Sequence, residues 1–268
     1  MPQTPNIPIV ISFSGLDSTG GAGLQADIEA IASMGCHAAP VATALTVQDT
    51  RTVVDFEPVK VTLFIEQARA VLEDMPVATI KIGMTASVEI IEAIHSILID
   101  YPDIPVVFDP VLASGKGDRL AGEGIVTAMR ELLLPQTTVL TPNSLEARAL
   151  APEADALEAA GQELLDAGSE FVLLTGTHED AEHVENRLFG NHRLLETFTW
   201  ERLPHSYHGS GCTLASAIAG LLAQGLEPFT AMHEAQEYTW EALQHAYRTG
   251  MGQLIPNRLF WARGEASS

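Results

Sequence analysis

The sequence predicts a single α/β domain built around a largely parallel sheet. Short apolar runs of strand length alternate with helical patterns from one end of the chain to the other, which is typical of βαβ units. The chain has 268 residues and is 46% hydrophobic, so it can bury one large core. The composition shows no break that would divide the chain. We therefore expect one domain over residues 1–268.

The expected elements follow one another in βα order. The first strand, residues 9–14, precedes a glycine-rich turn and a helix in which Leu24, Ile28 and Ile31 share one apolar face. Further strands are expected at residues 38–45, 79–82, 106–108, 138–140 and 171–174. Helices are expected between most of them, at residues 63–72, 88–98, 122–133 and 156–165. The remaining patterns indicate a flap strand, a hairpin and two closing helices at residues 52–59, 184–189 with 193–200, 212–223 and 231–247.

The charge balance restricts the partners that the chain can have. It carries 35 acidic and 14 basic residues, a formal charge of −21. This charge repels nucleic acid, and no Lys/Arg cluster could follow a phosphate backbone, so we expect no nucleic-acid partner. The acidic residues are dispersed, which indicates a solvated surface. A salt-rich cytoplasm is one hypothesis for their number, and a stability that stays flat or declines between low and molar salt would contradict it.

The same patterns argue against a membrane or secreted protein. No apolar stretch approaches the roughly 20 residues that a membrane-spanning helix needs. Residues 1–8 lack the basic cluster, apolar segment and cleavage pattern of a secretory signal. Two cysteines, Cys36 and Cys212, do not make a disulfide framework in a chain of this size. We therefore expect a cytoplasmic protein without membrane contact.

A glycine-rich segment, residues 208–213 (HGSGCT), lies between an expected loop and an expected helix. Free N–H groups at such a helix start form an anion site, which suits the charge of a transferring phosphoryl group. Cys212 would lie in the positive field of the helix terminus. We expect this field to lower the pKa of the thiol and to make the thiolate accessible near neutral pH. The spacing by itself is equally compatible with a tight turn in which the cysteine fills space.

A second glycine-rich loop, residues 15–23, comes directly after the first expected strand. Its three glycines at positions 20, 21 and 23 would let a ligand approach the backbone, although such turns also arise from packing alone. The loop is not a Walker A motif, because no Lys-Ser or Lys-Thr pair follows a spaced glycine. It does not match G-x-G-x-x-G either, which argues against a dinucleotide dehydrogenase.

Polar side chains also follow later strands. Asn143 and Glu146 stand three residues apart at a helix start, where an amide and a carboxylate could hold hydrated Mg²⁺ against nucleotide phosphates. A helix N-cap followed by a first-turn acid is the simpler interpretation of the same residues. Asp109 adds a carboxylate after residues 106–108, at the sheet edge where open α/β sheets bind ligands.

Other candidate sites have less support. His178, Glu179 and His183 have the wrong interval for a metalloprotease zinc site. Ser210 lacks the G-x-S-x-G frame of an esterase, because His208 occupies the first glycine position. We interpret the three tryptophans as packing residues and not as ligand stackers. These are Trp200, Trp240 and Trp261.

Taken in order, six blocks resemble the hydroxymethylpyrimidine/phosphomethylpyrimidine kinases of the ribokinase-like superfamily, over residues 9 to 225. The blocks are GLDSTGGAGLQAD at 15–27, TALTVQ at 43–48, KIGM at 81–84, DPV at 109–111, TPN at 141–143 with Glu146, and HGSGCT at 208–213. The resemblance implies a three-layer α/β/α fold with helices on both faces of a mainly parallel sheet, and a homodimer. It also implies ATP- and Mg²⁺-dependent phosphorylation of 4-amino-5-hydroxymethyl-2-methylpyrimidine and then of its monophosphate, which gives the pyrophosphate used for thiamin.

The resemblance assigns a role to particular residues of this chain. Asp27 and Gln48 would satisfy the amino group and ring nitrogens of the pyrimidine by hydrogen bonding. Cys212 would be the base, at a position where most of the superfamily carries an aspartate. The expected pyrimidine pocket is Gly15, Asp27, Gln48, Met84 and Val111. The expected nucleotide-binding residues are Asn143, Glu146, Thr175 and Ser210. The expected Mg²⁺ ligands are Asn143, Glu146 and Asp109, and Gly209 and Gly211 belong to the expected anion hole.

Two departures from the family pattern stand beside the resemblance. Thr175 replaces a common lysine that would lie near the nucleotide phosphates, unless Lys116 supplies that cation. Ser18 replaces a common proline in the first loop. A pyridoxal kinase is the nearest rival, and Cys212 with Gln48 favours a pyrimidine substrate. A sensor of the same fold without turnover is a second rival, for which Thr175 is the hint.

Overall fold

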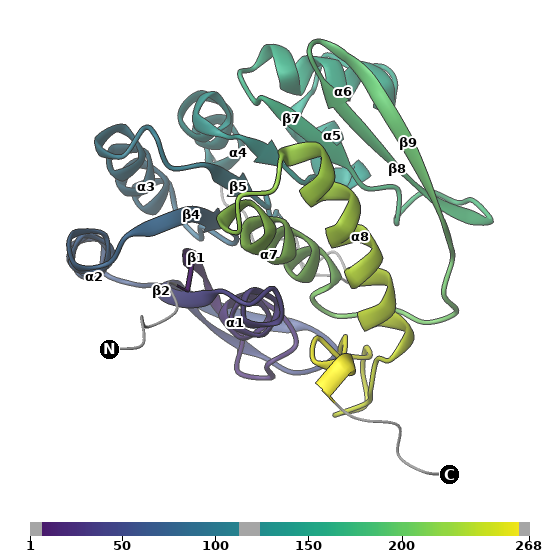
Figure 1. Cartoon of the computed structure of the whole chain (residues 1–268), viewed down its shortest axis with the longest axis horizontal. Coiled ribbons are helices and arrows are strands. Elements are labelled where there is room, and N and C mark those ends of the chain that lie inside the picture. Colours follow the sequence, from purple (N-terminus) through teal and green to yellow (C-terminus); the bar gives the residue numbers. More distant parts are fainter. Residues whose placement is uncertain (1–6, 113–123, 263–268) are drawn as a thin grey trace, which may run out of the picture.

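The computed structural model describes residues 7–112 and 124–262, and a nine-stranded sheet runs through them (Figure 1). The strand order is β3-β2-β1-β4-β5-β6-β7-β8-β9. Six central strands pair in parallel: β1 (Ile9–Leu16), β2 (His37–Gln48), β4 (Val77–Ile82), β5 (Val106–Phe108), β6 (Val139–Leu140) and β7 (Phe171–Leu174). The outer strands are antiparallel: β3 (Val53–Pro58), β8 (His183–Gly190) and β9 (Arg193–Glu201). The predicted mainly parallel sheet is therefore confirmed.

Helices cover both faces of this sheet and make the three layers that the resemblance implies. One face packs against α1 (Gly23–Ser33), α7 (Ser210–Ala223) and α8 (Pro228–Gln244). The other packs against α2 (Val61–Asp74), α3 (Val88–Asp100), α4 (Ile125–Ala128), α5 (Ser144–Leu150) and α6 (Leu157–Asp166). Neighbouring residues of β1 point into the cores on opposite faces of the sheet. Val10 packs in the core under α1, α7 and α8, and Ile11 and Phe13 pack in the core on the other face. Strands buried on both faces explain the continuous apolar runs in the sequence.

Several element boundaries differ from those that the sequence predicts. The helix expected at 122–133 is split: α4 is followed by a π-helical turn, Met129–Leu133, and a 3₁₀ turn, Leu134–Gln136. The expected start of this helix, and Lys116, lie outside the described residues. The last helix begins at Pro228, since proline fits a first helical position, and ends at Gln244.

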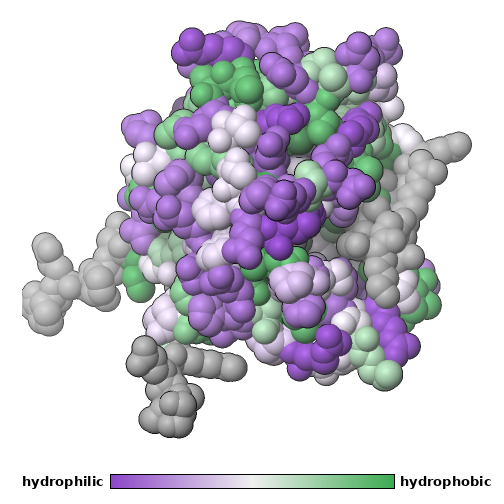
Figure 2. Space-filling view, turned by 90° about the vertical axis from the view of Figure 1, so that its right-hand side faces the viewer, coloured by the Kyte–Doolittle hydropathy of each residue, from purple (hydrophilic) through white to green (hydrophobic). Residues whose placement is uncertain are grey.

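The hydropathy of one face of the molecule is visible in the space-filling view of Figure 2. The face that carries β9 and α8 is mostly hydrophilic, with apolar groups scattered over it (Figure 2). Among residues 7–112 and 124–262, no helix combines the length and the apolar character that spanning a membrane requires.

Candidate active site

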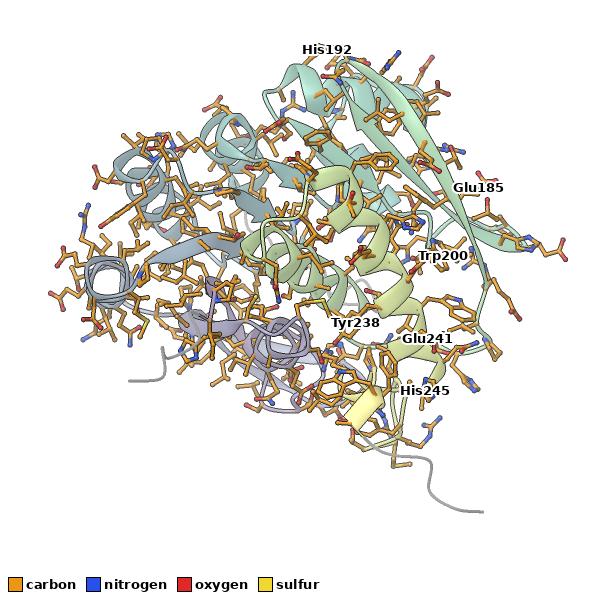
Figure 3. All side chains as sticks on the ribbon, in the orientation of Figure 1. Glu185, His192, Trp200, Tyr238, Glu241 and His245 are labelled. Carbon is orange, nitrogen blue, oxygen red and sulfur yellow. The ribbon has the colours of Figure 1, made fainter. Side chains whose placement is uncertain are left out.

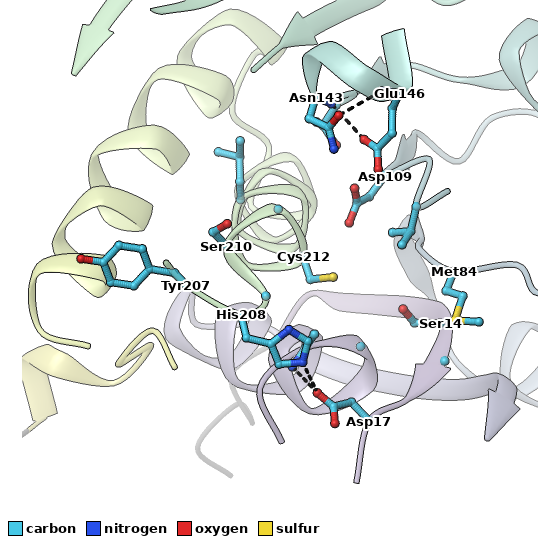
Figure 4. Close-up of a pocket in the computed structure, with 18 of the residues that line it drawn as sticks. Ser14, Asp17, Met84, Asp109, Asn143, Glu146, Tyr207, His208, Ser210 and Cys212 are labelled. Carbon is cyan, nitrogen blue, oxygen red and sulfur yellow. Dashed lines mark hydrogen bonds and ion pairs between the residues drawn. The ribbon is translucent and has the colours of Figure 1, made fainter. Parts of the chain in front are cut away.

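A cavity of about 170 Å³ lies where the central strands β1, β4, β5 and β6 end, against the first turn of α7 (Figure 4). Ligands bind at this edge in open α/β sheets, and the cavity brings together loops that are distant in the sequence. With one exception the predicted site residues line it. They are Gly15, Gln48, Met84, Asp109, Val111, Asn143, Glu146, Thr175, Gly209, Ser210, Gly211 and Cys212.

Asp27 is the exception, and its expected contact with the substrate is wrong. Its side chain lies on α1 and is completely buried, outside the lining of the cavity. One carboxylate oxygen accepts a 2.7 Å hydrogen bond from Ser12 Oγ. The other accepts one of 2.7 Å from Ser216 Oγ and lies 2.9 Å from Lys81 Nζ. Because both oxygens are already bonded, Asp27 holds the cation of Lys81 in place instead of binding a ligand.

Lys81 is a fixed, buried cation close to the cavity. Its side chain is completely buried on β4, and Nζ lies 3.5 Å from the Ser14 hydroxyl. Burial by itself would lower the pKa of Lys81, but the negative charge of Asp27 raises it above its ordinary value, helped by Cys212 and Asp109. The ammonium group therefore stays charged and contributes a positive potential beside Cys212.

The HGSGCT segment forms the helix N-terminus that the sequence predicts. Gly209 is the residue before α7 and has a left-handed φ of 83°, which favours glycine. The first backbone bond of this turn runs from Thr213 N–H to the Gly209 carbonyl at 2.9 Å. The N–H groups of Ser210, Gly211 and Cys212 precede that bond, as the free donors of a helix start do. They lie at the positive end of the α7 dipole, where an anion is stabilised.

A buried hydrogen bond joins the two glycine-rich loops. His208 Nε2 lies 2.8 Å from Asp17 Oδ2, and both side chains are largely buried (Figure 4). Asp17 also accepts hydrogen bonds from the backbone N–H groups of Thr19 and Ala22. Burial would raise the pKa of Asp17, but hydrogen bonds from His208, Gln48 and Thr19 hold it well below its usual range. The ionised carboxylate thus fixes the first loop against the start of α7.

The pKa of the Cys212 thiol is raised, whereas the sequence predicts that it is lowered. Its pKa is raised to about 12, first because burial disfavours the thiolate and then because Asp109 is negatively charged. Lys81 and the backbone N–H of Gly23 act in the opposite direction but do not prevail. The thiol donates a hydrogen bond to the Asp109 carboxylate, which also favours the protonated form of the sulfur. The prediction of an accessible thiolate near neutral pH is therefore wrong for the protein without ligands.

Asp109 and Glu146 form a pair of adjacent buried carboxyl groups (Figure 4). Burial raises the pKa of Asp109, and burial followed by repulsion from Asp109 raises that of Glu146 to about 8. Asp109 Oδ2 is buried and has no hydrogen-bond partner among the described residues. A divalent cation would offset the repulsion between the two carboxyl groups and would provide a partner for Asp109 Oδ2. These residues therefore fit Mg²⁺.

The Mg²⁺ site would need ligands from outside the protein. Across residues 7–112 and 124–262, three or more His, Cys, Asp or Glu side chains do not converge as a metal-binding group. Mg²⁺ commonly keeps several waters and takes one or two carboxylates together with substrate phosphates, which matches a site of two acids.

Asn143 has a structural role that limits its use as a metal ligand. Its Oδ1 accepts the backbone N–H groups of Leu145 at 2.9 Å and Glu146 at 3.0 Å, and Glu146 Oε2 accepts the Asn143 N–H at 2.9 Å. This capping box confirms the N-cap interpretation of the sequence. Since its oxygen is engaged, Asn143 can offer the cavity its Nδ2 donor (Figure 4). The expectation that it ligates the metal is corrected accordingly.

A larger cavity of about 410 Å³ adjoins the first. The residues that line both are Asn143, Thr175, His178, Tyr207, Ser210, Gly211 and Leu214. It lies between the β8–β9 hairpin and α8, where Figure 3 shows Trp200 on β9 facing the helix. Trp200 Nε1 donates to Gln236 Oε1 at 3.2 Å. The Trp200 and Trp240 ring centroids are 6.3 Å apart, and both rings line the cavity. These two tryptophans pack as expected but also offer aromatic surface to a ligand, whereas Trp261 is 60% exposed elsewhere.

No lysine lines either cavity in the part of the chain that the structure describes. Arg202 lines the larger one, but its guanidinium donates to the backbone carbonyls of Thr177, Glu179 and Ala181. It therefore holds the loop after Thr175 in place. Among the described residues, positive charge near the two cavities comes from the α7 terminus, from Lys81 and from Arg202.

Comparison with known proteins identifies the family. A model of the family described as phosphomethylpyrimidine kinase matches residues 17–257. The chain belongs to this family. Over 98% of both chains it is 36% identical to the hydroxymethylpyrimidine/phosphomethylpyrimidine kinase of Streptomyces coelicolor. It is also 35% identical to the chloroplastic thiamine biosynthetic bifunctional enzyme of Arabidopsis thaliana, over 90% of this chain and 47% of that longer protein.

A solved structure agrees with the fold. The pyridoxal kinase of Staphylococcus aureus, in complex with AMP-PCP and pyridoxal, superposes with a TM-score of 0.86 at 25% identity, covering 96% of each chain. The ribokinase-like architecture is therefore confirmed, and the chain is a phosphotransferase, as its family membership indicates.

Some residues at the site were not assigned a role there from the sequence. His208 and Lys81 lie inside the blocks that carry the resemblance, and a lysine within the apolar run of β4 is the signal that could have marked a buried ion pair. Trp200, Trp240 and Gln236 gave no such signal, because their contact depends on how the hairpin packs against α8.

Proposed function

We propose that the chain phosphorylates 4-amino-5-hydroxymethyl-2-methylpyrimidine with ATP and then phosphorylates the monophosphate, giving the pyrophosphate used for thiamin. The observation that carries the proposal is Cys212 in the first turn of α7, where it lines the small cavity beside Ser210 and Gly211, which line both cavities. The small cavity suits a single aromatic ring, with Met84 and Val111 as apolar walls and Gln48 as a polar partner. Family membership supports the same substrate.

The larger cavity is the proposed site of ATP. Trp200 and Trp240 would pack on the base, and the phosphates would extend toward the residues that both cavities share. The N–H groups of Ser210, Gly211 and Cys212 would receive the charge of the transferring phosphoryl group. Asp109 and Glu146 would hold Mg²⁺, and the bound ion would neutralise phosphate charge. Asn143 would donate its Nδ2 to a phosphate oxygen.

Cys212 is the proposed base for the substrate hydroxyl, and its pKa must fall for this role. The negative charge of Asp109 raises that pKa, so occupation of the acid pair by a cation removes part of the cause. Lys81 and the Gly23 N–H already favour the thiolate. The thiolate would take the proton while the hydroxyl oxygen attacks the γ-phosphorus and ADP leaves. In the second step the acceptor phosphate is largely ionised already, so the base should matter less.

An ADP-release assay tests this function. Wild type, Cys212→Ala and Cys36→Ala would each receive Mg²⁺-ATP with the hydroxymethylpyrimidine, its monophosphate or pyridoxal. Cys36 is a matched control, because it is buried against Gly220 outside both cavities. We expect turnover of both pyrimidines, and a loss in Cys212→Ala that is larger for the first step. Turnover of pyridoxal alone would refute the substrate, and equal losses in both steps would refute the base.

We further propose that the chain acts as a homodimer, as the resemblance implies. We also propose that it is a single domain in the cytoplasm, as the composition and the cysteine usage indicate. Light scattering would measure the mass in solution, and a value near that of one 28.7 kDa chain would contradict the dimer.

A further inference from the structure

The chain after α8 returns across the molecule to the start of α7. We call residues 250–258 the C-terminal strap. Its backbone bonds to the anion-hole loop, where the Leu254 carbonyl accepts the His208 N–H at 2.8 Å. It also bonds to the β2–β3 turn, where the Thr50 carbonyl accepts the Gln253 N–H at 2.9 Å. The strap therefore spans the two sides of the cavity and ends at Arg258, which does not line it.

Arg258 is the largest fully buried side chain in the described residues. Its guanidinium uses each of its three nitrogens on a different part of the site. Nε donates to Thr213 Oγ1 at 2.8 Å, and Nη1 donates to Glu29 Oε2 on α1 at 3.0 Å. Nη2 donates to the Gly21 carbonyl of the first glycine-rich loop. One side chain thus connects α7, α1 and the first loop.

These contacts converge on the peptide that joins Gly209 to Ser210. Thr213 Oγ1, which accepts from Arg258, itself donates to the Gly209 carbonyl at 2.7 Å. The C=O and N–H of a trans peptide point in opposite directions. Holding the Gly209 carbonyl toward Thr213 therefore turns the Ser210 N–H the other way, toward the cavity that Ser210 lines. A Cβ on Gly209 would lie 2.0 Å from the Gly21 carbonyl, so the two loops meet here with no space between them.

We propose that Arg258 is a positioning residue for phosphoryl transfer, which acts through Thr213 and Gly21 to fix the Gly209–Ser210 peptide so that the donors of the first α7 turn face the phosphoryl group. The proposal rests on the proposed anion-hole role of residues 209–212. A buried guanidinium costs desolvation energy, and Glu29, its acidic partner among the described residues, is itself 24% exposed. An apolar side chain could fill the same space without this cost. The planar guanidinium instead uses its N–H donors to connect α7, α1 and the first glycine-rich loop.

Steady-state kinetics of Arg258→Met and Arg258→Lys test this role. Tyr238→Phe is the matched control, because it removes a hydrogen bond to the Arg258 carbonyl and leaves the guanidinium intact. In Arg258→Met we expect kcat to fall between about 10- and 100-fold, the range for misplaced catalytic groups, while the KM for the pyrimidine changes less than about threefold. Arg258→Lys should recover part of kcat, and Tyr238→Phe should retain wild-type kcat. ADP-binding stoichiometry by calorimetry would count the folded fraction of each variant.

Two results would overturn the positioning role. One is a wild-type kcat per folded molecule in Arg258→Met, and the other is a loss confined to KM. If Arg258→Met does not fold, Thr213→Val and Thr213→Ser replace it. Serine keeps the hydroxyl that links Arg258 to the Gly209 carbonyl, so a kcat loss in valine with retention in serine supports the proposal, and equal kcat values refute it. Failure of the wild type to phosphorylate any pyrimidine would instead refute the proposed function.

Discussion

Glu146→Gln should make the protein more stable at alkaline pH. Glutamine has the same shape, and its amide oxygen can still accept the Asn143 N–H of the capping box. It lacks the charge that burial and Asp109 penalise, which raises the pKa of Glu146 from 4.5 to about 8. Each pKa unit corresponds to about 1.36 kcal/mol, so the ionisation of Glu146 costs the folded wild type roughly 5 kcal/mol at most.

The sign of the pH dependence follows from the raised pKa. The folded state holds the Glu146 proton more tightly than the unfolded chain does. This contribution to stability is complete below pH 4.5 and is lost as the pH rises through about 8. Glu146→Gln has no such proton to lose. Its free energy of unfolding should therefore exceed that of the wild type by a few kcal/mol, on the order of 2–4, at pH 8.5, and the difference should shrink toward pH 5.

Urea unfolding followed by tryptophan fluorescence measures this difference, in EDTA and without nucleotide. Wild type and Glu146→Gln would be compared at several values between pH 5 and 8.5. A variant that is less stable than the wild type at pH 8.5, or a difference that does not change with pH, would refute the buried-acid account. Added Mg²⁺-nucleotide should stabilise the wild type more than the variant, because the variant lacks one of the two proposed carboxylate ligands.

Three further changes test other parts of the site. Lys81→Met leaves the buried Asp27 carboxylate without its cation and should lower the free energy of unfolding in urea by about 3–5 kcal/mol. The double variant Lys81→Met, Asp27→Asn should recover part of this stability. An unchanged urea midpoint in Lys81→Met would contradict the ion pair. Gly209→Ala should lower kcat at least about tenfold, since its Cβ would collide with the Gly21 carbonyl. Gly225→Ala should keep the wild-type kcat, because Gly225 is also left-handed but a Cβ there would meet no atom of the described residues within 4 Å. Equal kcat values in the two alanine variants would speak against the close loop contact. Trp240→Ala should raise the KM for ATP about tenfold and leave the KM for the pyrimidine unchanged, and a shift in the pyrimidine KM instead would move the nucleotide out of the larger cavity.

The sequence predicts the architecture well because its strands are buried on both faces. Runs as short as Val106–Phe108 are apolar throughout, and helical patterns separate them, so their order along the chain is readable. The break of the predicted 122–133 helix into α and π turns is not readable in the same way, because no proline or glycine marks the change at Met129. The π-helical turn contacts α3, which is a tertiary contact that the local sequence does not show.

The site was predicted to the level of its loops but not to the chemistry of each group. Gly15, Met84 and Gly211 share one cavity as expected, because the ends of parallel strands meet at one edge. Asp27 was misassigned as a substrate-binding residue. An acid in a helix after a glycine-rich loop gives no sign that Lys81, on β4, forms an ion pair with it. The pKa of Cys212 was misjudged because helix position is local, whereas the desolvation that dominates comes from tertiary packing.

The most direct test of the account is the mass of the product that forms from the hydroxymethylpyrimidine and Mg²⁺-ATP over time. We predict a species one phosphoryl group heavier that appears first, followed by a species two phosphoryl groups heavier that accumulates as the first declines. Two sequential transfers would support one site, centred on Cys212 and the α7 terminus, that accepts both a hydroxyl and a phosphate. An unmodified pyrimidine after complete incubation, with pyridoxal phosphorylated under the same conditions, would contradict it.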